Sequence, residues 1–325
     1  MKPVEVLLTA PMRSSAVDAL GRAFQLHPLW EQADAQAFLA EVGPRIRGVA
    51  TSTLFGRVDS DLLDRLPAAE IIASFGVGYD NVDVLAAAER GIVVTNTPGV
   101  LDDEVADLTI GLLIATLRRI PQADRFVREG RWAAGAFPLS PTLRGRRVGL
   151  VGFGNIGQAI ARRLSAFGVA LAYHSRSPKA GSEVEYHPTL RGLAEASDVL
   201  IAIVPGGPAT RHLIGRDVLE ALGSEGVLIN VSRGSVVDEQ ALIDALQSGT
   251  ILAAGLDVYE DEPHVPEPLI DMEQVVLLPH IGSASTHTRT AMGQLVVDNL
   301  VSWFERGVAI TPVPETRHLA ARRPA

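Results

Sequence analysis

Residues 147–157, Arg-Val-Gly-Leu-Val-Gly-Phe-Gly-Asn-Ile-Gly, decide the fold of this 325-residue chain. The run 147–151 is mostly aliphatic and predicts a strand, and a helical pattern follows the glycines. Glycines spaced G-x-G-x-x-G between a strand and a helix let the backbone approach a pyrophosphate at the helix N-terminus. The alternative, a tight turn that binds nothing, is disfavoured by this setting. The stretch therefore predicts a Rossmann domain whose cofactor loop comprises Gly152, Phe153, Gly154, Asn155, Ile156 and Gly157.

The residues after the next predicted strand, 169–173, indicate which dinucleotide is bound. An NAD site needs an Asp or Glu about 20 residues after the glycines to accept the ribose 2′-hydroxyl. Here the strand runs into Ser175, Arg176 and Ser177, and the first acid after it is Glu183. An arginine offers a fork of donors to a 2′-phosphate, and the serines add hydroxyls. The sequence therefore favours NADP(H), with NAD(H) as the weaker cofactor; Arg176 as a solvated loop charge is the alternative.

Short aliphatic runs alternate with helical patterns along the chain, which is typical of parallel βα units. In the N-terminal part, strands are predicted over 4–9, 48–51, 71–74 and 91–95, with helices over 14–24 and 85–90. The later strands are predicted over 147–151, 169–173, 198–203, 226–230, 253–257 and 275–278. A helix is expected over about 285–304, followed by a frayed polar tail, 315–325. The fold class is therefore α/β, with two doubly wound parallel-sheet domains.

The segment 101–120 predicts a long helix between these two series. It opens with three acidic residues and closes with Arg118 and Arg119, which is the order that the helix dipole favours, and Pro121 is expected to stop it. Its interior is apolar nearly all round. Such a helix is expected to be buried on every side, between domains or between subunits.

Composition excludes several classes of function. The formal net charge of −9 disfavours a general binder of nucleic acid or of an anionic membrane surface. The chain has no cysteine, and its eight histidines are scattered, so no metal site is predicted. Glu5 interrupts the apolar run at the N-terminus, and no apolar stretch reaches the ~20 residues of a membrane span. We therefore expect a cytoplasmic protein of 34.5 kDa in two domains.

Three later segments each place a chemically useful side chain after a predicted strand, where open α/β sheets bind their ligands. They are Asn230-Val-Ser-Arg233, Gly255-Leu-Asp257-Val-Tyr-Glu-Asp-Glu262 and Leu278-Pro-His280. An arginine can bind and polarise carbonyl and carboxylate oxygens, and a histidine can deliver a proton. A carboxylate beside that histidine favours its protonated form. Taken singly, these residues could be a helix-capping or ion-paired arginine, a loop acid and a core histidine. Together they predict reduction of a 2-keto acid.

The motifs together resemble the D-isomer-specific 2-hydroxyacid dehydrogenases. The matching stretches are GVGYDNVD (residues 76–83), GFGNIGQAIARRL (152–164), NVSRGSVVDE (230–239), GLDVYEDEP (255–263) and LLPHIGSAS (277–285), which cover nearly the whole chain. The resemblance implies that Arg233 binds substrate, that His280 is the acid/base and that Glu262 pairs with it. It also implies that the backbone amides of Val77 and Gly78 hold the substrate carboxylate.

Further expectations come from the same resemblance. Asp257 would bind the nicotinamide carboxamide, and Leu54 would contact substrate. The cofactor cleft would also include Val204, Pro205, Thr210, Val231, Ser232 and Gly282. Trp132 and Phe137 would shape the substrate pocket or pack an arm of a dimer. Residues 1–99 with 285–325 would form a flavodoxin-like substrate domain and 100–284 the NADP-binding domain, with a homodimer formed through the long helix and the arm at 131–138.

The resemblance is greatest to the NADPH-dependent glyoxylate/hydroxypyruvate reductase branch. It implies reduction of glyoxylate and hydroxypyruvate to glycolate and D-glycerate. One alternative is a reductase of a bulkier 2-keto acid, hydroxyphenylpyruvate or 2-ketogluconate. Another is a non-catalytic NADP-dependent sensor or corepressor, since the superfamily includes corepressors. The sequence does not discriminate between these 2-keto acids, because one methylene in a pocket changes the free energy of binding by only ~1–3 kcal/mol.

Overall fold

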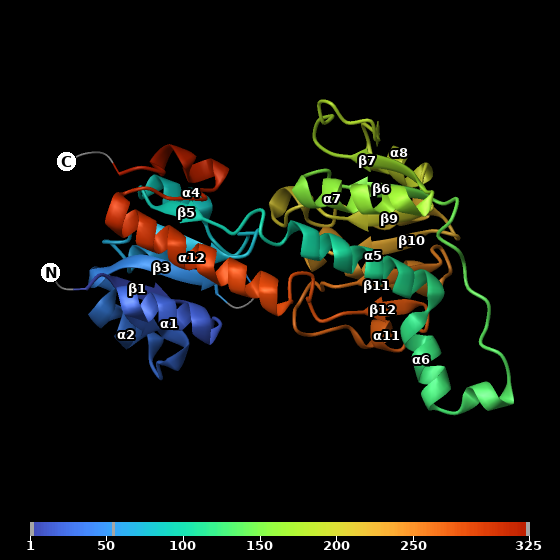
Figure 1. Cartoon of the computed structure of the whole chain (residues 1–325), viewed down its shortest axis with the longest axis horizontal. Coiled ribbons are helices and arrows are strands. Elements are labelled where there is room, and N and C mark those ends of the chain that lie inside the picture. The colour runs from blue at the N-terminus through green and yellow to red at the C-terminus, as the bar shows by residue number, and fades with distance from the viewer. Residues whose placement is uncertain (1–2, 54–55, 323–325) are drawn as a thin grey trace. The chain divides into compact units, whose positions relative to one another are not determined.

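The computed structural model describes residues 3–53 and 56–322 of the chain. These residues form two compact units, which Figure 1 shows as two separate sheets with their helices. Unit 1 takes the chain up to residue 101 together with the part from residue 285 onward. Unit 2 is the continuous segment 102–284. Each unit is an α/β domain in which every paired strand is parallel, so the predicted fold class is confirmed.

Unit 1 is built on a five-stranded sheet in the order β2-β1-β3-β4-β5. The strands are β1 (Glu5–Leu8), β2 (Gln25–Pro28), β3 (Ile46–Ser52), β4 (Ile71–Phe75) and β5 (Val93–Thr95). This is the flavodoxin-like doubly wound order, in which ligands bind beyond the carboxyl ends of the strands. The sequence patterns predicted four of these strands. They missed β2, a short edge strand with a polar sequence.

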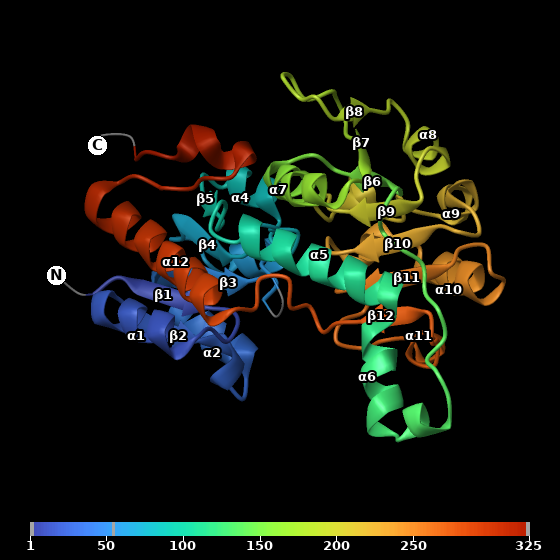
Figure 2. The same ribbon diagram turned by 45° about the vertical axis from the view of Figure 1, so that its right-hand side comes forward.

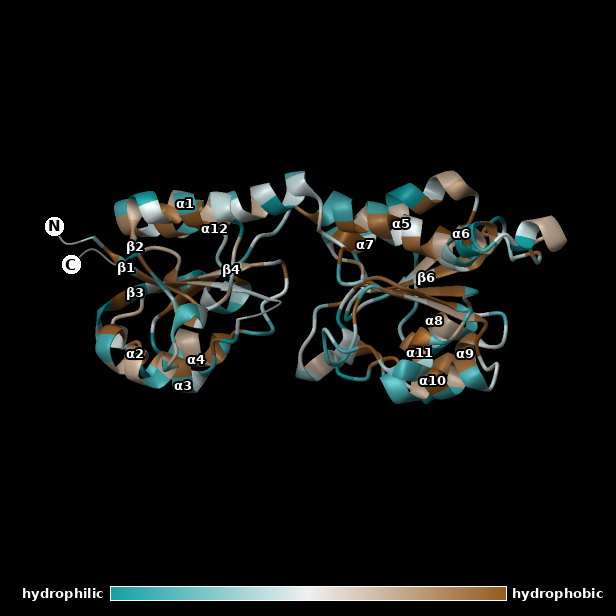
Figure 3. Cartoon of the chain, turned by 90° about the horizontal axis from the view of Figure 1, so that it is seen from below, coloured by the Kyte–Doolittle hydropathy of each residue, from teal (hydrophilic) through white to brown (hydrophobic). Residues whose placement is uncertain are grey.

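Helices cover both faces of this sheet. They are α1 (Ser14–Ala23), α2 (Ala35–Val42), α3 (Ser60–Asp64), α4 (Val84–Glu89) and α12 (Thr286–Arg306). Figure 3 shows α1 and α12 on one face and α2, α3 and α4 on the other. Leucine, isoleucine and valine side chains from the second group pack with those of β1, β3 and β4 in one buried cluster. Helix α12, which follows unit 2 in the chain, thus completes the sheet-and-helix layers of unit 1.

The C-terminal residues 314–322 are ordered, so the expectation of a frayed tail is wrong for them. A short 3₁₀ turn, Pro314–Leu319, lies beside the edge strand β5. The fully buried Thr316 hydroxyl accepts the N–H of Val94 at 3.0 Å and donates to its carbonyl oxygen at 3.2 Å. The guanidinium of Arg322 lies over the rings of Trp303 and Phe304. The tail therefore satisfies backbone groups that an edge strand otherwise exposes.

Replacing Thr316 with valine is expected to destabilise the protein by about 1–3 kcal/mol, because the buried N–H of Val94 loses its acceptor. The substitution keeps the shape of the side chain and removes only the hydroxyl. Urea unfolding at neutral pH measures the change. Thr316→Ser keeps the hydroxyl and is the matched control. Equal losses for valine and serine would show that packing, and not the hydrogen bond, stabilises this edge.

Unit 2 is built on a seven-stranded sheet in the order β12-β11-β10-β9-β6-β7-β8. The strands are β6 (Arg147–Val151), β7 (Ala170–His174), β8 (Glu185–Tyr186), β9 (Val199–Ala202), β10 (Val227–Asn230), β11 (Ala253–Leu256) and β12 (Val275–Leu277). Read from β8, the unit's strands follow the Rossmann order 3-2-1-4-5-6, and β12 adds one more. The order reverses between β6 and β9, which is the switch point where a dinucleotide binds.

Two buried clusters hold helices to the two faces of the second sheet. One face carries α5 (Asp102–Arg118) and α7 (Asn155–Leu164), with α6 (Ile120–Arg128) following α5. The other carries α8 (Leu190–Glu195), α9 (Arg216–Leu222), α10 (Glu239–Gln247) and α11 (Glu267–Ile270). Figures 2 and 3 show these two groups on opposite sides of the sheet. The β6–loop–α7 unit predicted from the sequence lies at the centre.

The long helix differs from its prediction in two ways. Pro121 does not stop it: Arg119 takes a left-handed conformation, φ 51°, and Pro121 lies in the first turn of the next helix, α6. Proline suits that position because its missing N–H has no partner there anyway. Second, only one face of α5 is fully buried, and Leu108, Ile110 and Ile114 are half-buried in the single chain. A homodimer through this helix stays a prediction.

Candidate active site

The glycine loop joins β6 to α7 and has the backbone geometry of a phosphate cradle. At Gly152, φ is +104° and a Cβ would lie 2.4 Å from the carbonyl oxygen of Ile203. At Gly157 a Cβ would lie 2.6 Å from the carbonyl oxygen of Gly152, so helix and strand pack as closely as glycine permits. A Cβ on the exposed Gly154 would meet nothing within 4 Å. The loop is tight at its ends and open at its middle, as a bound pyrophosphate requires.

The other residues of this loop divide into backbone and side-chain contributors. Phe153 points into the core, where its ring stacks on Tyr173 with centroids 4.1 Å apart. Asn155 begins α7, and the cap residue before it provides no side-chain hydrogen bond. Uncapped first-turn N–H groups are an anion-binding feature of a helix N-terminus. Asn155 also hydrogen-bonds the carboxylate of Asp102, whose pKa is raised because burial disfavours its charge. The residues present therefore fit a dinucleotide.

The loop after β7 carries the predicted cofactor-selecting residues. The Ser175 hydroxyl donates to the carbonyl oxygen of Ser177 at 2.7 Å. Tyr186 donates to the carbonyl oxygen of Ser175 at 3.3 Å, which fixes the start of the loop. Arg176 and Ser177 are exposed. Within residues 3–53 and 56–322, the Arg176 guanidinium has no hydrogen-bond or ion-pair partner, so it is available to an external anion.

The loop after β9 borders the glycine loop, and the loop after β10 carries Arg233. The position that a Cβ on Gly152 would take lies 2.9 Å from a methyl group of Val204. The Thr210 hydroxyl donates to the carbonyl oxygen of Pro205 at 2.7 Å, which closes the loop after β9. After β10, Val231 is buried in the core, and the Arg233 guanidinium donates to the carbonyl oxygen of Ser232 at 2.7 Å.

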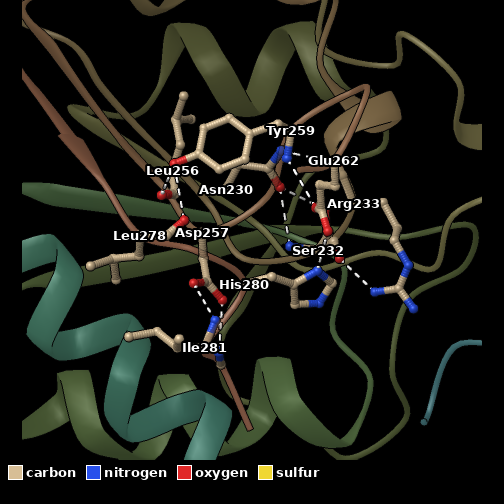
Figure 4. Close-up of polar contacts among 11 residues, drawn as sticks. Asn230, Ser232, Arg233, Leu256, Asp257, Tyr259, Glu262, Leu278, His280 and Ile281 are labelled. Atoms are coloured by element: carbon tan, nitrogen blue, oxygen red, sulfur yellow. Dashed lines mark hydrogen bonds and ion pairs between the residues drawn. The ribbon is translucent and has the colours of Figure 1, made fainter. Parts of the chain in front are cut away.

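His280 and Glu262 form the pair that the sequence predicted. His280 Nδ1 lies 2.6 Å from Glu262 Oε2, and the backbone N–H of Tyr259 donates to Glu262 Oε1 at 3.1 Å (Figure 4). Burial alone would raise the pKa of Glu262. The hydrogen bond and charge of His280, the Tyr259 N–H and the charge of Arg233 outweigh burial and lower that pKa. Glu262 is therefore a carboxylate at neutral pH, and it accepts the Nδ1 proton of His280.

Asp257 hydrogen-bonds the backbone of residues 280–282 and so fixes the position of His280. His280 has a left-handed conformation, φ 53°, and its N–H donates to the carbonyl oxygen of Asp257 at 2.9 Å. The Asp257 carboxylate, 2% exposed, accepts the N–H groups of Ile281 at 2.7 Å and of Gly282 at 2.8 Å. Burial raises the pKa of Asp257 despite these bonds. The predicted contact of Asp257 with the nicotinamide stays a prediction.

The predicted substrate-carboxylate residues follow β4 in unit 1. The side-chain amide of Asn96 donates to the carbonyl oxygen of Val77 at 2.8 Å, and the Gly76 N–H donates to Thr97 Oγ1 at 3.2 Å. Among the described residues, neither Val77 nor Gly78 donates its backbone N–H to a partner. Leu54, the other predicted contact, lies outside the described residues.

The predicted arm follows α6 and contains the turn Arg131–Ala134. The Phe137 ring packs edge-on against Phe126 with centroids 5.3 Å apart, so its contacts within the chain are those of a packing residue. Trp132 is 69% exposed. Its predicted place in a substrate pocket or a dimer arm stays a prediction.

In the described part of the chain, no group of three or more His, Asp or Glu side chains is arranged to hold a metal ion. None of its helices is both long enough and apolar enough to cross a membrane.

The sequence analysis missed two supporting residues. Asn230 ends β10 and hydrogen-bonds the turn that carries Arg233. The hydroxyl of Tyr259 donates to the carbonyl oxygen of Leu278 at 2.9 Å, which ties the end of β11 to the segment before His280. An asparagine two residues before a serine, directly after a buried strand, is a signal that could have predicted the first.

Comparisons with known proteins show what the chain is similar to. Residues 110–282 match the family model of the D-isomer specific 2-hydroxyacid dehydrogenase NAD binding domain. The chain is 45% identical to the hydroxyphenylpyruvate reductase of Plectranthus scutellarioides, over 96% of this chain and 100% of the relative. It is also 45% identical to a glyoxylate/hydroxypyruvate reductase of Arabidopsis thaliana, with the same coverage.

Among solved structures, the chain is similar to an NADPH-dependent glyoxylate/hydroxypyruvate reductase of Sinorhizobium meliloti, crystallised with NADP and malonate. The two sequences are 54% identical, each chain is covered over 100% of its length, and the TM-score is 0.94.

Proposed function

Because the chain belongs to the D-isomer-specific 2-hydroxyacid dehydrogenases, we propose that it reduces the small 2-keto acids glyoxylate and hydroxypyruvate with NADPH. The products are glycolate and D-glycerate. The observation that carries the proposal is the 2.6 Å pair of His280 and Glu262, in the same unit as the glycine loop and the exposed Arg176. The S. meliloti relative, which is NADPH-dependent, supports the choice of cofactor.

His280 is the proton donor of the proposed reaction. A bound NADPH supplies the hydride that adds to the carbonyl carbon of the 2-keto acid. With Nδ1 donating to Glu262, His280 presents Nε2 to the substrate and protonates the carbonyl oxygen as negative charge develops there. The Glu262 carboxylate stabilises the positive imidazolium and fixes the orientation of its ring.

Arg233 and the loop after β4 orient the substrate. The guanidinium of Arg233 binds the carboxylate and polarises the carbonyl through charge-assisted hydrogen bonds. The backbone N–H groups of Val77 and Gly78, which have no partner among the described residues, donate hydrogen bonds to the substrate carboxylate. The loop 152–157 holds the cofactor pyrophosphate through its backbone, and Arg176 with the neighbouring serines binds the 2′-phosphate.

A bulkier aryl 2-keto acid is the second candidate substrate. It is favoured by the relative from P. scutellarioides, a hydroxyphenylpyruvate reductase that is as similar to this chain as the A. thaliana enzyme. The chemistry of His280, Glu262 and Arg233 is the same for both candidates, and only the fit of the side chain differs.

The experiment that tests the proposal follows oxidation of NADPH and, separately, of NADH by the purified protein. Glyoxylate, hydroxypyruvate, pyruvate, hydroxyphenylpyruvate and 2-ketogluconate are supplied in turn. Faster turnover of glyoxylate or hydroxypyruvate with NADPH supports the proposal. Turnover of only the bulkier acids assigns the second candidate. Binding of NADPH without turnover of any acid contradicts both and indicates a sensor.

Replacing Arg176 with alanine is expected to raise the KM for NADPH at least tenfold and to leave the KM for NADH within about twofold. The reason is that a hydrogen bond to a charged group contributes about 1.5–3 kcal/mol, and only NADPH carries the 2′-phosphate. Initial rates at saturating keto acid measure both constants. Arg144→Ala, at an exposed arginine before the amino end of β6, is the control and changes neither. Equal losses for the two cofactors would remove Arg176 from the 2′-phosphate site.

A further inference from the structure

The turn after β10 is held by a buried amide. Asn230 is 1% exposed, and its Oδ1 accepts both the N–H of Ser232, at 3.1 Å, and the Ser232 hydroxyl, at 2.8 Å. Its Nδ2 donates to the carbonyl oxygen of Arg233 at 3.0 Å. These three hydrogen bonds of the Asn230 side chain all run to the turn that presents Arg233, as Figure 4 shows.

The strand itself does not need this side chain. Val227, Leu228 and Ile229 are fully buried, and the carbonyl oxygen of Asn230 already accepts the N–H of Asp257 at 3.0 Å. A buried polar amide at the end of such a strand costs stability unless it is hydrogen-bonded. The hydrogen bonds of Asn230 therefore serve the turn and not the sheet.

The same turn is pressed against the segment that carries Glu262. A Cβ on Gly234 would lie 1.8 Å from the carbonyl carbon of Tyr259 and 2.3 Å from the backbone nitrogen of Glu260. The N–H of Tyr259 in turn donates to Glu262. The turn is therefore hydrogen-bonded to Asn230 on one side. On the other side it packs against the backbone of Tyr259 and Glu260, and the Tyr259 N–H holds the Glu262 carboxylate.

We propose that Asn230 is a positioning residue that fixes the Arg233 guanidinium relative to Glu262 and His280, and so sets how well the 2-keto acid is bound and polarised. This inference rests on the proposed function, because it requires Arg233 to touch the substrate. Asn230 is too deeply buried to do so itself. Asn230 therefore affects substrate binding only by positioning Arg233.

A double-mutant cycle in the full-length protein tests this route. The variants are Asn230→Ala, Arg233→Lys and their combination, and the readouts are kcat and KM for glyoxylate and hydroxypyruvate and the Kd for NADPH. Asn230→Ala alone is expected to lower kcat/KM at least tenfold while the Kd for NADPH changes less than threefold. Adding Asn230→Ala to Arg233→Lys is expected to cost less than threefold, because the fork that Asn230 positions is already gone.

Two further variants separate positioning from general stability. Asn299 is also 1% exposed, and its amide bonds the backbone of Leu295, Ile310 and Thr311 in unit 1. Asn299→Ala is expected to lower the melting temperature without lowering kcat/KM in the folded protein. Asn230→Asp is isosteric and keeps the acceptor for Ser232 while losing the donor to Arg233. If Asn230→Ala does not fold, this variant takes its place in the cycle.

The outcomes are distinct. An equal loss from the Asn230 variant in both backgrounds, with Arg233→Lys itself impaired, overturns the inference and leaves the proposed function standing. A loss of NADPH affinity as large as the loss of kcat/KM overturns it too, because Asn230 then acts through Ser232 on the cofactor. Undiminished kcat/KM in Arg233→Lys overturns the role of Arg233, and the inference falls with it.

Discussion

Replacing His280 with asparagine lowers kcat for keto-acid reduction by about 10²–10⁴-fold, which is the usual contribution of a positioned acid/base group. Asparagine is the better probe than alanine or glutamine here because His280 has a left-handed backbone, φ 53°, that asparagine tolerates. The variant keeps the carbonyl of Asp257 bonded to residue 280 and removes the imidazole. Initial rates at saturating substrate and NADPH measure the loss.

The control for this variant is His318→Asn, at an exposed histidine in the C-terminal turn of unit 1. It is expected to leave kcat unchanged. The Kd for NADPH should be the same in both variants and the parent. A His280 variant that binds NADPH normally and turns over at the parent rate would contradict the assignment of His280 as proton donor.

Replacing Glu262 with glutamine lowers kcat/KM for reduction by about tenfold to a hundredfold at neutral pH, because a charge-assisted hydrogen bond becomes a neutral one. Profiles of kcat/KM from pH 3 to 9 measure the change, and Glu267→Gln, at an exposed acid, is the control.

The behaviour of the protein at acid pH follows from the lowered pKa of Glu262. A carboxyl whose pKa is depressed on folding adds stability above its unfolded pKa, and this stability is lost as the pH falls through the folded value. The parent keeps the ion pair into the range where an ordinary glutamate is protonated. The glutamine variant has no such acid transition. A profile for Glu262→Gln that matched the parent on its acid limb would show that the Glu262 carboxylate does not set the acid side of the pH dependence.

The sequence predicted the fold class and the family, and both are confirmed. It also predicted that Arg233, Glu262 and His280 follow strands of one domain, and they follow β10, β11 and β12. That much follows from parallel topology, because such strands end at one edge of the sheet. The pairing of His280 with Glu262 was implied only by the family resemblance, and the 2.6 Å distance between them comes from the structure.

The features that the sequence did not predict depend on tertiary contacts. The edge strand β2 is short and polar, and pairing with β1 stabilises it more than its own propensity does. Pro121 has the same local signal whether it ends one helix or starts the next, and the left-handed Arg119 decides between them. The ordered C-terminal turn depends on Thr316 reaching an edge strand more than 200 residues earlier.

The placement of α12 has a consequence for synthesis on the ribosome. Unit 2 is encoded by one continuous segment, whereas unit 1 is split, and α12 is translated after the whole of unit 2. Unit 2 can therefore complete its sheet while the nascent chain is still attached, as domains generally fold as units. The face of β4 that α12 covers must wait, with Phe75 uncovered, until residues 286–306 emerge. Unit 1 therefore begins before unit 2 along the chain and is completed only after it.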